Sequence, residues 1–581
     1  MRLADFHINH DNINTVVVEL QDIYNEFSSG MQDISALRDF VKMLYDRAHA
    51  GEEPKYLLLF GDGSYDNKNR VEGNTNYVPT WQSYSSLNPV GSYVKDDFYA
   101  LYDEDDLVDI GVGRFVVVSE SQAKSAVDKV IHYATNTDAV MNEWRNIICL
   151  IADDEDQNLH FSDAEKLAYQ IDTSNHTINI DKIYLDAYEQ ISTPSGERYP
   201  QVTQDITNRV ERGALLMNYV GHGGELGLAH ERILKIADIN SWNNIDNMPV
   251  FMTATCEFSR FDDPTRTSAG EYVFLNPNGA GISLFTTTRA TYAGANAALN
   301  KNFLQFMLTR VDGEYYRMGD VIRLAKNQTG SIENRNKFVL LGDPALAFAF
   351  PEENVITSKI NNVSVQALTD TVKALSEITI EGELQDIEGN KLSDFNGTLF
   401  PIVFDKPTRY TTLGNDPASS PTNFYIQKNP LYKGQATIEN GDWSFTFITP
   451  KDIAYEYGYG KLSYYAKNDK LDAAGYYLDV VVGGYNENAA IDLEGPVVNL
   501  FMCDTLFKSG GITDEHPDLL AHIEDESGIN TVGSGIGHNI VATLDDSEEF
   551  ILNDYYEADL NNYCKGKINY PFFNLKAVIM Y

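Results

Sequence analysis

Uninterrupted apolar runs alternate with helical patterns through the first 350 residues. Runs at residues 56–60 and 147–152 lack the polar alternation of a strand with one solvated face, so we predict strands buried on both faces. A strand is also expected at residues 14–20, and a helix near residues 162–171. This alternation predicts an α/β fold with a doubly wound, mostly parallel sheet that helices cover on both faces.

The pattern changes after residues 342–351. Beyond this point short β-prone segments alternate with turn signals such as Asn396-Gly397, which is typical of all-β sandwich domains of immunoglobulin-like type. At about 150 residues per domain, a chain of this length has roughly three to four domains. We therefore expect two α/β parts followed by two β parts, the last of them partial: residues 1–150, 151–351, 352–494 and 495–581.

Charge and cysteine content exclude several classes of protein. The net charge of −41 is spread over short acidic clusters, so we expect no nucleic-acid partner. The four cysteines include no CxxC pair, so neither a disulfide framework nor a structural zinc site is predicted.

No segment has the roughly 18 apolar residues of a membrane span. The chain starts without a signal sequence, which taken literally indicates a cytoplasmic protein, whereas residues 574–581 resemble a strand cut short and indicate a fragment.

Two polar residues stand where buried strands are expected to end. His222 follows the apolar run 215–220, and Cys256 follows a second run that ends at Ala254. The carboxyl ends of neighbouring parallel strands meet at one edge of a sheet, so these two side chains are predicted to form a nucleophile and its base. Gly223 would let its N–H approach a substrate carbonyl, and this N–H with that of Cys256 is the predicted oxyanion hole. The alternative interpretation is a buried core thiol and a loop histidine without a catalytic role.

An apolar block that ends in His-Gly, followed by a block that ends in Ala-x-Cys, resembles the caspase-like cysteine peptidases. More narrowly, the chain resembles the gingipain family, peptidase family C25. Six segments carry this resemblance in order: residues 56–63, 92–99, 109–115, 218–224, 253–256 and 340–346. The resemblance implies a caspase-like α/β peptidase with His222 as base and Cys256 as nucleophile, and no required cofactor.

Within that family the layout resembles the surface-located sortase of the type IX secretion system of Bacteroidetes, and residues 525–538 resemble its C-terminal region. This implies removal of C-terminal sorting signals from exported cargo proteins, with lipopolysaccharide as a further partner. It also implies an exported, cell-surface location, which replaces the cytoplasmic interpretation. Two alternatives stay open: a transpeptidase that uses the same residues, and a non-catalytic surface or adhesion protein whose β modules carry the function.

The resemblance implies two further assignments. Asp109 aligns with the acidic residue that orients the histidine in gingipains, although it is shorter than the family's glutamate. Gingipain-like enzymes can bind calcium, and the acidic runs 103–106 and 153–156 offer oxygen ligands, but neither run has EF-hand spacing. We interpret both runs as solvated loops, and His132, His160 and His230 as surface or helix residues.

Overall fold

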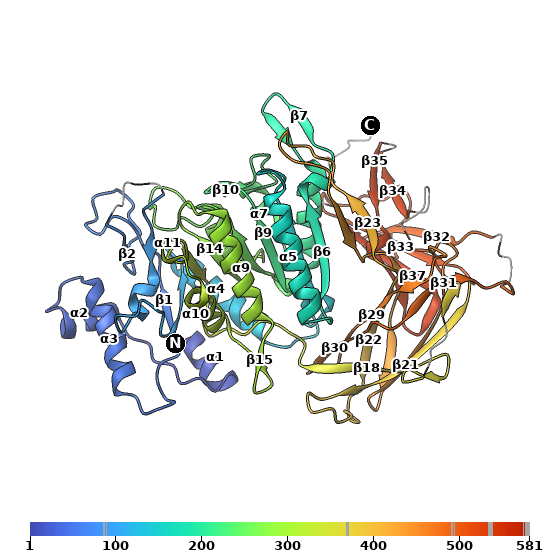
Figure 1. Ribbon diagram of the computed structural model, residues 1–581, viewed down its shortest axis with the longest axis horizontal. Helices are drawn as coiled ribbons and strands as arrows, with labels where there is room; N and C mark the ends of the chain where they lie inside the picture. Colours follow the sequence, from blue (N-terminus) through green and yellow to red (C-terminus); the bar gives the residue numbers. More distant parts are fainter. Residues whose placement is uncertain are drawn as a thin grey trace. The chain divides into compact units, whose positions relative to one another are not determined.

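The computed structural model describes the chain except for a few short segments, which are residues 85–87, 89, 368–370, 490, 491, 493, 533–538, 546, 573, 574 and 576–581. The chain forms two compact units. Unit 1 comprises Met1–Phe350 together with Tyr410–Phe424, and unit 2 comprises Pro351–Arg409 and Tyr425–Tyr581. Figure 1 labels the elements along the chain. The finer division into four domains stays a prediction.

An eight-stranded mixed sheet is the centre of unit 1. Its order is β1-β4-β17-β14-β13-β9-β5-β6. The strands in that order are β1 (Tyr56–Phe60), β4 (Gly111–Phe115), β17 (Phe338–Leu341), β14 (Ser283–Thr287), β13 (Val250–Ala254), β9 (Leu216–Val220), β5 (Ile147–Ala152) and β6 (Asn179–Tyr184). The five strands from β14 to β6 run parallel, β17 runs antiparallel to β14, and β4 and β1 run parallel to β17. The predicted α/β fold with a mostly parallel sheet is confirmed at this level, but the reversal at β17 was not predicted.

Helices cover this sheet. They are α1 (Arg2–His10), α2 (Leu20–Phe27), α3 (Ile34–Arg47), α4 (Glu120–Ala134), α5 (Leu159–Ser174), α6 (Pro200–Arg212), α7 (Ile236–Ser241), α8 (Ala269–Leu275), α9 (Ala293–Met307), α10 (Met318–Gln328) and α11 (Ile332–Arg335). Helices α5 and α9 contact each other over the central strands (Figure 1). The strand predicted at residues 14–20 is wrong: Val16 and Val17 are exposed, no strand pairs with the segment, and Leu20 already begins α2.

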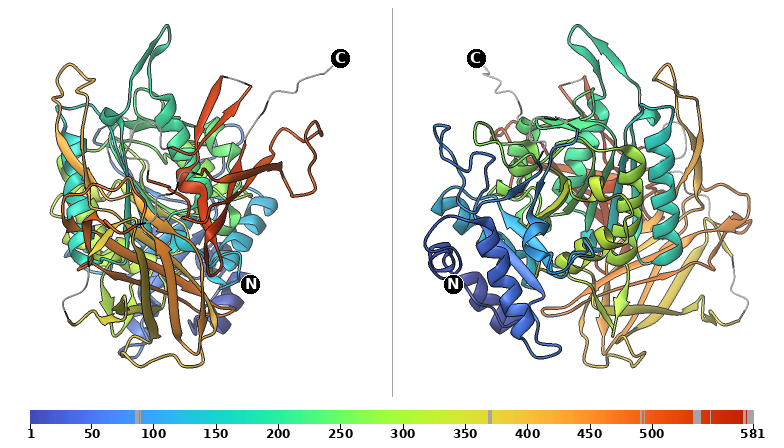
Figure 2. Two further views of the ribbon diagram at one scale, coloured as in Figure 1. Left: turned by 90° about the vertical axis from the view of Figure 1, so that its right-hand side faces the viewer. Right: turned by 60° about the vertical axis from the view of Figure 1, so that its left-hand side comes forward.

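Short strands of unit 1 lie outside the eight-stranded sheet, in the segments that connect its elements. They are β2 (Trp81–Gln82), β3 (Val94–Lys95), β7 (Ile191–Thr193), β8 (Gly196–Arg198), β10 (Gly223–Gly224), β11 (Gly227–Leu228), β12 (Leu234–Lys235), β15 (Arg310–Val311) and β16 (Glu314–Tyr315). The β7–β8 hairpin projects from unit 1 (Figures 1 and 2). The β10–β11–β12 ribbon directly follows His222, so it belongs to the surroundings of the candidate site.

Unit 2 is built from strands. Its main sheet contains β18 (Glu353–Ile360), β19 (Val363–Ser364), β21 (Glu377–Gln385), β22 (Gly397–Phe404), β25 (Pro430–Lys433), β26 (Ala436–Glu439), β27 (Asp442–Ile448), β29 (Lys461–Lys467) and β30 (Asp472–Tyr477). The parallel pairing of β18 with β30 closes the path of this sheet on itself. A second, antiparallel sheet contains β32 (Val497–Met502), β33 (Asp518–Glu524), β37 (Asn562–Pro571) and β36 (Tyr556–Asp559). The predicted β-rich second half is confirmed, whereas the immunoglobulin-like sandwich stays a prediction.

The remaining strands form smaller sheets: β20 (Val372–Ala374), β28 (Gly458–Tyr459) and β31 (Val481–Tyr485), then the pairs β23 (Thr408–Thr411) with β24 (Asn423–Ile426), and β34 (Val541–Leu544) with β35 (Glu548–Ile551). Among the described helices, none has the length and apolar content to cross a lipid bilayer. Two expectations fall partly on residues outside the description, namely the C-terminal resemblance at residues 525–538 and the strand at residues 574–581.

A buried histidine connects α1 to the loop after β17. The imidazole of His7 lies 2.7 Å from Asp11 Oδ2 and 2.8 Å from Asp343 Oδ2. Burial opposes protonation of His7, but the two carboxylates outweigh it and raise the pKa of His7 to about 9. Asp343 follows Gly342 at the end of β17, so this contact joins the start of the chain to the sheet.

Unit 1 is therefore expected to lose stability as the pH rises from about 6.5, the ordinary histidine pKa, to about 9. Because folding raises the pKa of His7, protonated His7 stabilises the folded state by about 3 kcal/mol at pH values below 6.5. This stabilisation is lost once the pH exceeds the folded-state pKa of about 9. Thermal unfolding across this window should show a falling midpoint for the parent and for His49→Gln, an exposed control. The midpoint of His7→Gln should fall less over the same pH range. An equal fall in His7→Gln and His49→Gln would contradict the assignment to His7.

Candidate active site

His222 and Cys256 occupy equivalent positions on adjacent strands. β9 and β13 pair in parallel, and the last pair in register is Val220 with Ala254. His222 and Cys256 each lie two residues beyond that pair, so both leave the sheet at the same edge. The structure thus brings together the two residues that the sequence predicted as base and nucleophile, at the edge where such sheets carry their sites.

The sulfur of Cys256 is held by the neighbouring loop. The Thr291 N–H donates to Sγ at 3.3 Å, and Sγ lies 3.7 Å from the Thr291 carbonyl oxygen. Thr291 follows β14, the other neighbour of β13, and its hydroxyl donates to the Thr255 carbonyl at 3.0 Å. No hydrogen bond joins Sγ to the His222 ring in the described structure, so the thiol rests against Thr291. Thr291 could not be predicted as a contact of the nucleophile, because nothing in its local sequence pattern marks it.

The backbone N–H groups of Cys256 and Gly223 form no hydrogen bond with an acceptor among the described residues. Glu257, directly after Cys256, has φ 52°, a left-handed conformation that ends the strand direction abruptly. The Cys256 N–H donates to no acceptor among the described residues. Ala229 N–H donates to the His222 carbonyl, so Gly223 occupies a non-hydrogen-bonded position of the β10–β11 ladder and its N–H points away from β11.

Gly223 also packs directly against the cysteine loop. A Cβ at this position would lie 2.6 Å from Thr255 Oγ1, too close for any larger residue without displacement. The absence of a side chain at Gly223 therefore lets the histidine loop and the cysteine loop approach each other. The two amides predicted as oxyanion donors come from these two loops.

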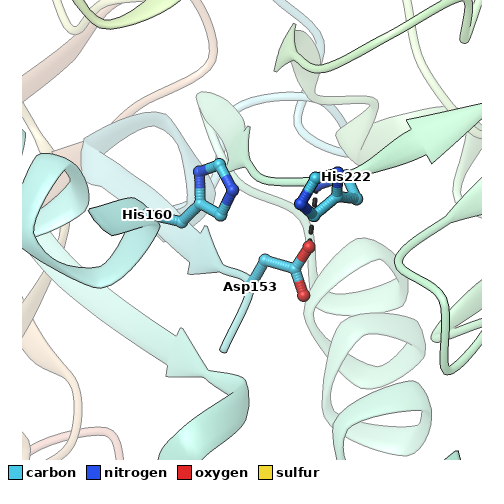
Figure 3. A group of neighbouring side chains, drawn as sticks. All are labelled: Asp153, His160 and His222. Atoms are coloured by element: carbon cyan, nitrogen blue, oxygen red, sulfur yellow. Dashed lines mark hydrogen bonds between the residues drawn. The ribbon is translucent and has the colours of Figure 1, made fainter. Parts of the chain in front are cut away.

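Carboxylates at the end of β5 surround His222. Asp153 Oδ2 accepts the backbone N–H of His222 at 2.7 Å (Figure 3). The ring Nε2 lies 3.4 Å from Glu155 Oε2 and 3.3 Å from Asp156 Oδ2, without hydrogen-bond geometry to either. Because β5 pairs with β9, the loop after β5 necessarily lies beside the loop after β9. The run 153–156, interpreted from the sequence as a solvated loop, thus includes buried residues that contact the candidate base.

The structure does not bring Asp109 to His222. Asp109 precedes β4, and its carboxylate accepts the Tyr102 N–H at 2.9 Å. Burial raises its pKa above the ordinary aspartate value. β4 is four strands from β9 in the sheet, a separation of about 19 Å at about 4.8 Å per strand. The carboxylates beside the imidazole therefore come from Asp153, Glu155 and Asp156 instead.

Two further histidines flank the His222 ring. His160, on the first turn of α5, meets it edge to face with centroids 5.2 Å apart, and His230 stacks on it at 5.0 Å. His160 was interpreted from the sequence as a surface or helix residue; it is helical but only 4% exposed. Burial and then the nearby His222 lower the pKa of His160 below the ordinary histidine value.

A segment distant in sequence supports the acidic loop. Ser419 Oγ donates to the Asp154 carbonyl at 2.7 Å, and Asn158 Nδ2 donates to the Ser420 carbonyl at 3.1 Å. Both serines belong to Tyr410–Phe424, the part of unit 1 that follows the first strands of unit 2 in sequence. These contacts fix the backbone that carries Asp153, Glu155 and Asp156.

Residues 1–349 match the family model described as peptidase family C25. The chain belongs to peptidase family C25. Members of this family are cysteine peptidases, so the predicted gingipain resemblance and the predicted cysteine-type peptidase class are confirmed. No curated protein matches the chain.

Several solved structures are similar to the chain. Dimeric latent PorU from Porphyromonas gingivalis is 25% identical over 99% of this chain and 50% of that chain, with a TM-score of 0.37. The complex of the pro- and mature domains of Porphyromonas gingivalis RgpB is 16% identical over 83% and 96% of the two chains, with a TM-score of 0.47. The Arg-specific cysteine proteinase gingipain R is 16% identical over 79% and 90%, with a TM-score of 0.45. The chain thus spans about half the length of the PorU chain.

The competing assignments of the orienting carboxylate can be separated by labelling. Asp109→Asn should leave the rate at which a peptidyl acyloxymethyl ketone labels Cys256 unchanged, because its carboxylate is distant from His222. Glu155→Gln combined with Asp156→Asn should slow labelling by about 100-fold, since a carboxylate beside the imidazole orients it and stabilises its charged form. Mass spectrometry of the labelled protein measures both rates. Slow labelling in Asp109→Asn alone would restore the assignment made from the sequence.

Proposed function

We propose that the chain is a cysteine endopeptidase that cleaves peptide bonds through a thioester intermediate. The observation that supports this most is the equivalent placement of His222 and Cys256 beyond the paired ends of β9 and β13. The imidazole takes the thiol proton, the sulfur attacks the substrate carbonyl, and the imidazolium then protonates the leaving amine. Water attacks the thioester in the second half of the reaction and regenerates the thiol.

The surrounding groups have distinct roles in this proposal. The N–H groups of Gly223 and Cys256 stabilise the oxyanion of the tetrahedral intermediate. Asp153 fixes the backbone of His222 through its N–H. Glu155 and Asp156 lie beside Nε2 and stabilise the imidazolium, which leaves Nδ1 to exchange the proton with Cys256.

We further propose that the substrates are exported cargo proteins from which the enzyme removes C-terminal sorting signals. The resemblance in motifs and layout supports this assignment, together with membership of peptidase family C25. The proposal includes a location outside the cell or at the outer-membrane surface, and immunoglobulin-like sandwich modules in unit 2. An amine of lipopolysaccharide then competes with water for the thioester, and any bound calcium has a structural role. A non-catalytic adhesion role is not favoured, because the chain retains both His222 and Cys256.

The test uses an exported protein that carries its C-terminal signal as substrate. The parent and Cys503→Ser, an exposed-cysteine control, should remove the signal, whereas Cys256→Ala and His222→Ala should lose activity by at least about 1000-fold. Mass spectrometry of the new C-terminus distinguishes a free carboxylate, formed by water, from an amide, formed by a glycan amine. Cleavage by Cys256→Ala at the parent rate would refute the mechanism, and cleavage of other peptides but not of the signal would refute the substrate.

A further inference from the structure

The surroundings of His222 carry a concentration of carboxyl groups that no lysine or arginine of the described residues offsets. Five carboxylates lie close to this imidazole or to one another: Asp153, Asp154, Glu155, Asp156 and Glu231. In the described part of the chain, none of them forms an ion pair with a lysine or arginine. Asp153 and Asp154 are each only 1% exposed, and Glu231 is 4% exposed. Buried charge of one sign is costly unless a cation compensates for it.

His160 provides a second, independent observation. Its side chain is only 5% exposed, and neither ring nitrogen makes a hydrogen bond within the described structure. The closest carboxylate oxygen, Asp156 Oδ2, lies 3.4 Å from Nε2 without hydrogen-bond geometry. A buried polar group without a hydrogen bond costs about 1–3 kcal/mol, so its retention calls for a binding partner. Figure 3 shows the His160 ring beside the His222 ring and the Asp153 carboxylate.

The three residues are spaced as the ligands of a small cation. One ligand atom each of Asp153, His160 and His222 lies within 4.8 Å of the others. Bond lengths of about 2.0–2.2 Å put the ligand atoms of a tetrahedral site about 3.3 Å apart, so small side-chain rotations would gather this set. Two imidazoles and one carboxylate are a donor set typical of Zn²⁺ with one open position. Ca²⁺ prefers oxygen ligands alone and needs more of them.

We propose that Asp153, His160 and His222 bind one Zn²⁺ ion, and that the bound ion reversibly inhibits the peptidase. A neutral imidazole has one nitrogen lone pair available. Once the metal takes that lone pair from His222, the other ring nitrogen carries a proton and cannot accept one from Cys256. The inhibitory consequence rests on the proposed function, whereas the binding site does not.

A neighbouring set of residues competes for this assignment. Glu155, His222 and His230 also place one ligand atom each within 4.8 Å of one another. His230 is 69% exposed at its side chain, and its Nδ1 already pairs with Glu155 Oε1 at 2.7 Å. The set with His160 is favoured because its nitrogens are buried and have no hydrogen bond.

Direct binding tests the site without reference to activity. The Cys256→Ala substitution removes the reactive thiolate as a possible ligand. Isothermal titration of this protein with ZnCl₂ should then show one binding site per chain. Adding His160→Phe should weaken binding by at least about tenfold, whereas adding His230→Phe, the matched control, should not. X-ray absorption should show imidazole and oxygen ligands with no sulfur. Equal affinity in the His160→Phe protein, sulfur ligation, or no binding at micromolar zinc would overturn the site.

Activity tests the inhibitory role. Zn²⁺ should stop signal removal by the protein with Cys256 intact, a chelator should restore it, and Ca²⁺ should have no such effect. His160→Phe protein should stay active at zinc concentrations that inhibit the parent. Equal inhibition of both proteins, or zinc binding without inhibition, would overturn the inhibitory role. Inactivity of the metal-free parent would instead refute the proposed function and leave the binding experiment to decide the site.

Discussion

The parallel pairing of β9 with β13 is the contact on which the candidate active site depends. All five residues of each strand are buried, so a shift of register would move side chains between the two faces of the sheet. Buried polar pairs fix the positions further. Asn218 and Asn300 exchange reciprocal amide hydrogen bonds of 2.8 Å, which ties β9 to α9, and Thr253 donates to Thr286 at 2.7 Å between β13 and β14. With that register, His222 and Cys256 leave the sheet side by side.

The same edge concentrates groups that are costly to bury. Desolvation raises the pKa of Asp153 well above its ordinary range, and burial with repulsion from Asp154 raises the pKa of Glu231 to about 7. Perturbed carboxyl groups beside a histidine and a cysteine are typical of a functional site rather than of a packed core. The hydrogen bonds from the Tyr410–Phe424 segment hold the backbone of this acidic loop in place. The free-energy cost of burying these carboxyl groups is thus concentrated beside His222, where a proton must move or a cation can bind.

Much of this arrangement could be predicted from local sequence patterns. The run 147–152 predicts β5 correctly because uninterrupted apolar residues require burial on both faces. His222 and Cys256 could be found because each follows such a run. The segment 14–20 has equally strand-like residues, yet no neighbouring strand pairs with it, and pairing is not encoded in the segment itself.

The orienting carboxylate could not be found in this way, since strand order in a sheet is a property of the whole fold. Asp109 precedes one strand and Asp153 follows another, and the sequence alone does not say that β5, rather than β4, lies beside β9. The reversal of direction at β17 is hidden for the same reason. Its apolar residues Phe338–Leu341 fit a buried strand of either direction. Long-range topology therefore decides which predicted residues meet.

The measurement that bears most directly on this arrangement is a crystal structure of the protein with a peptide aldehyde. The aldehyde carbon should bond to Cys256 Sγ, and its oxygen should lie about 2.7–3.1 Å from the backbone nitrogens of both Gly223 and Cys256. The His222 ring should contact the adduct from the adjacent strand end. An unmodified Cys256, or an adduct whose oxygen faces away from Gly223 and whose carbon lies out of reach of His222, would contradict the account.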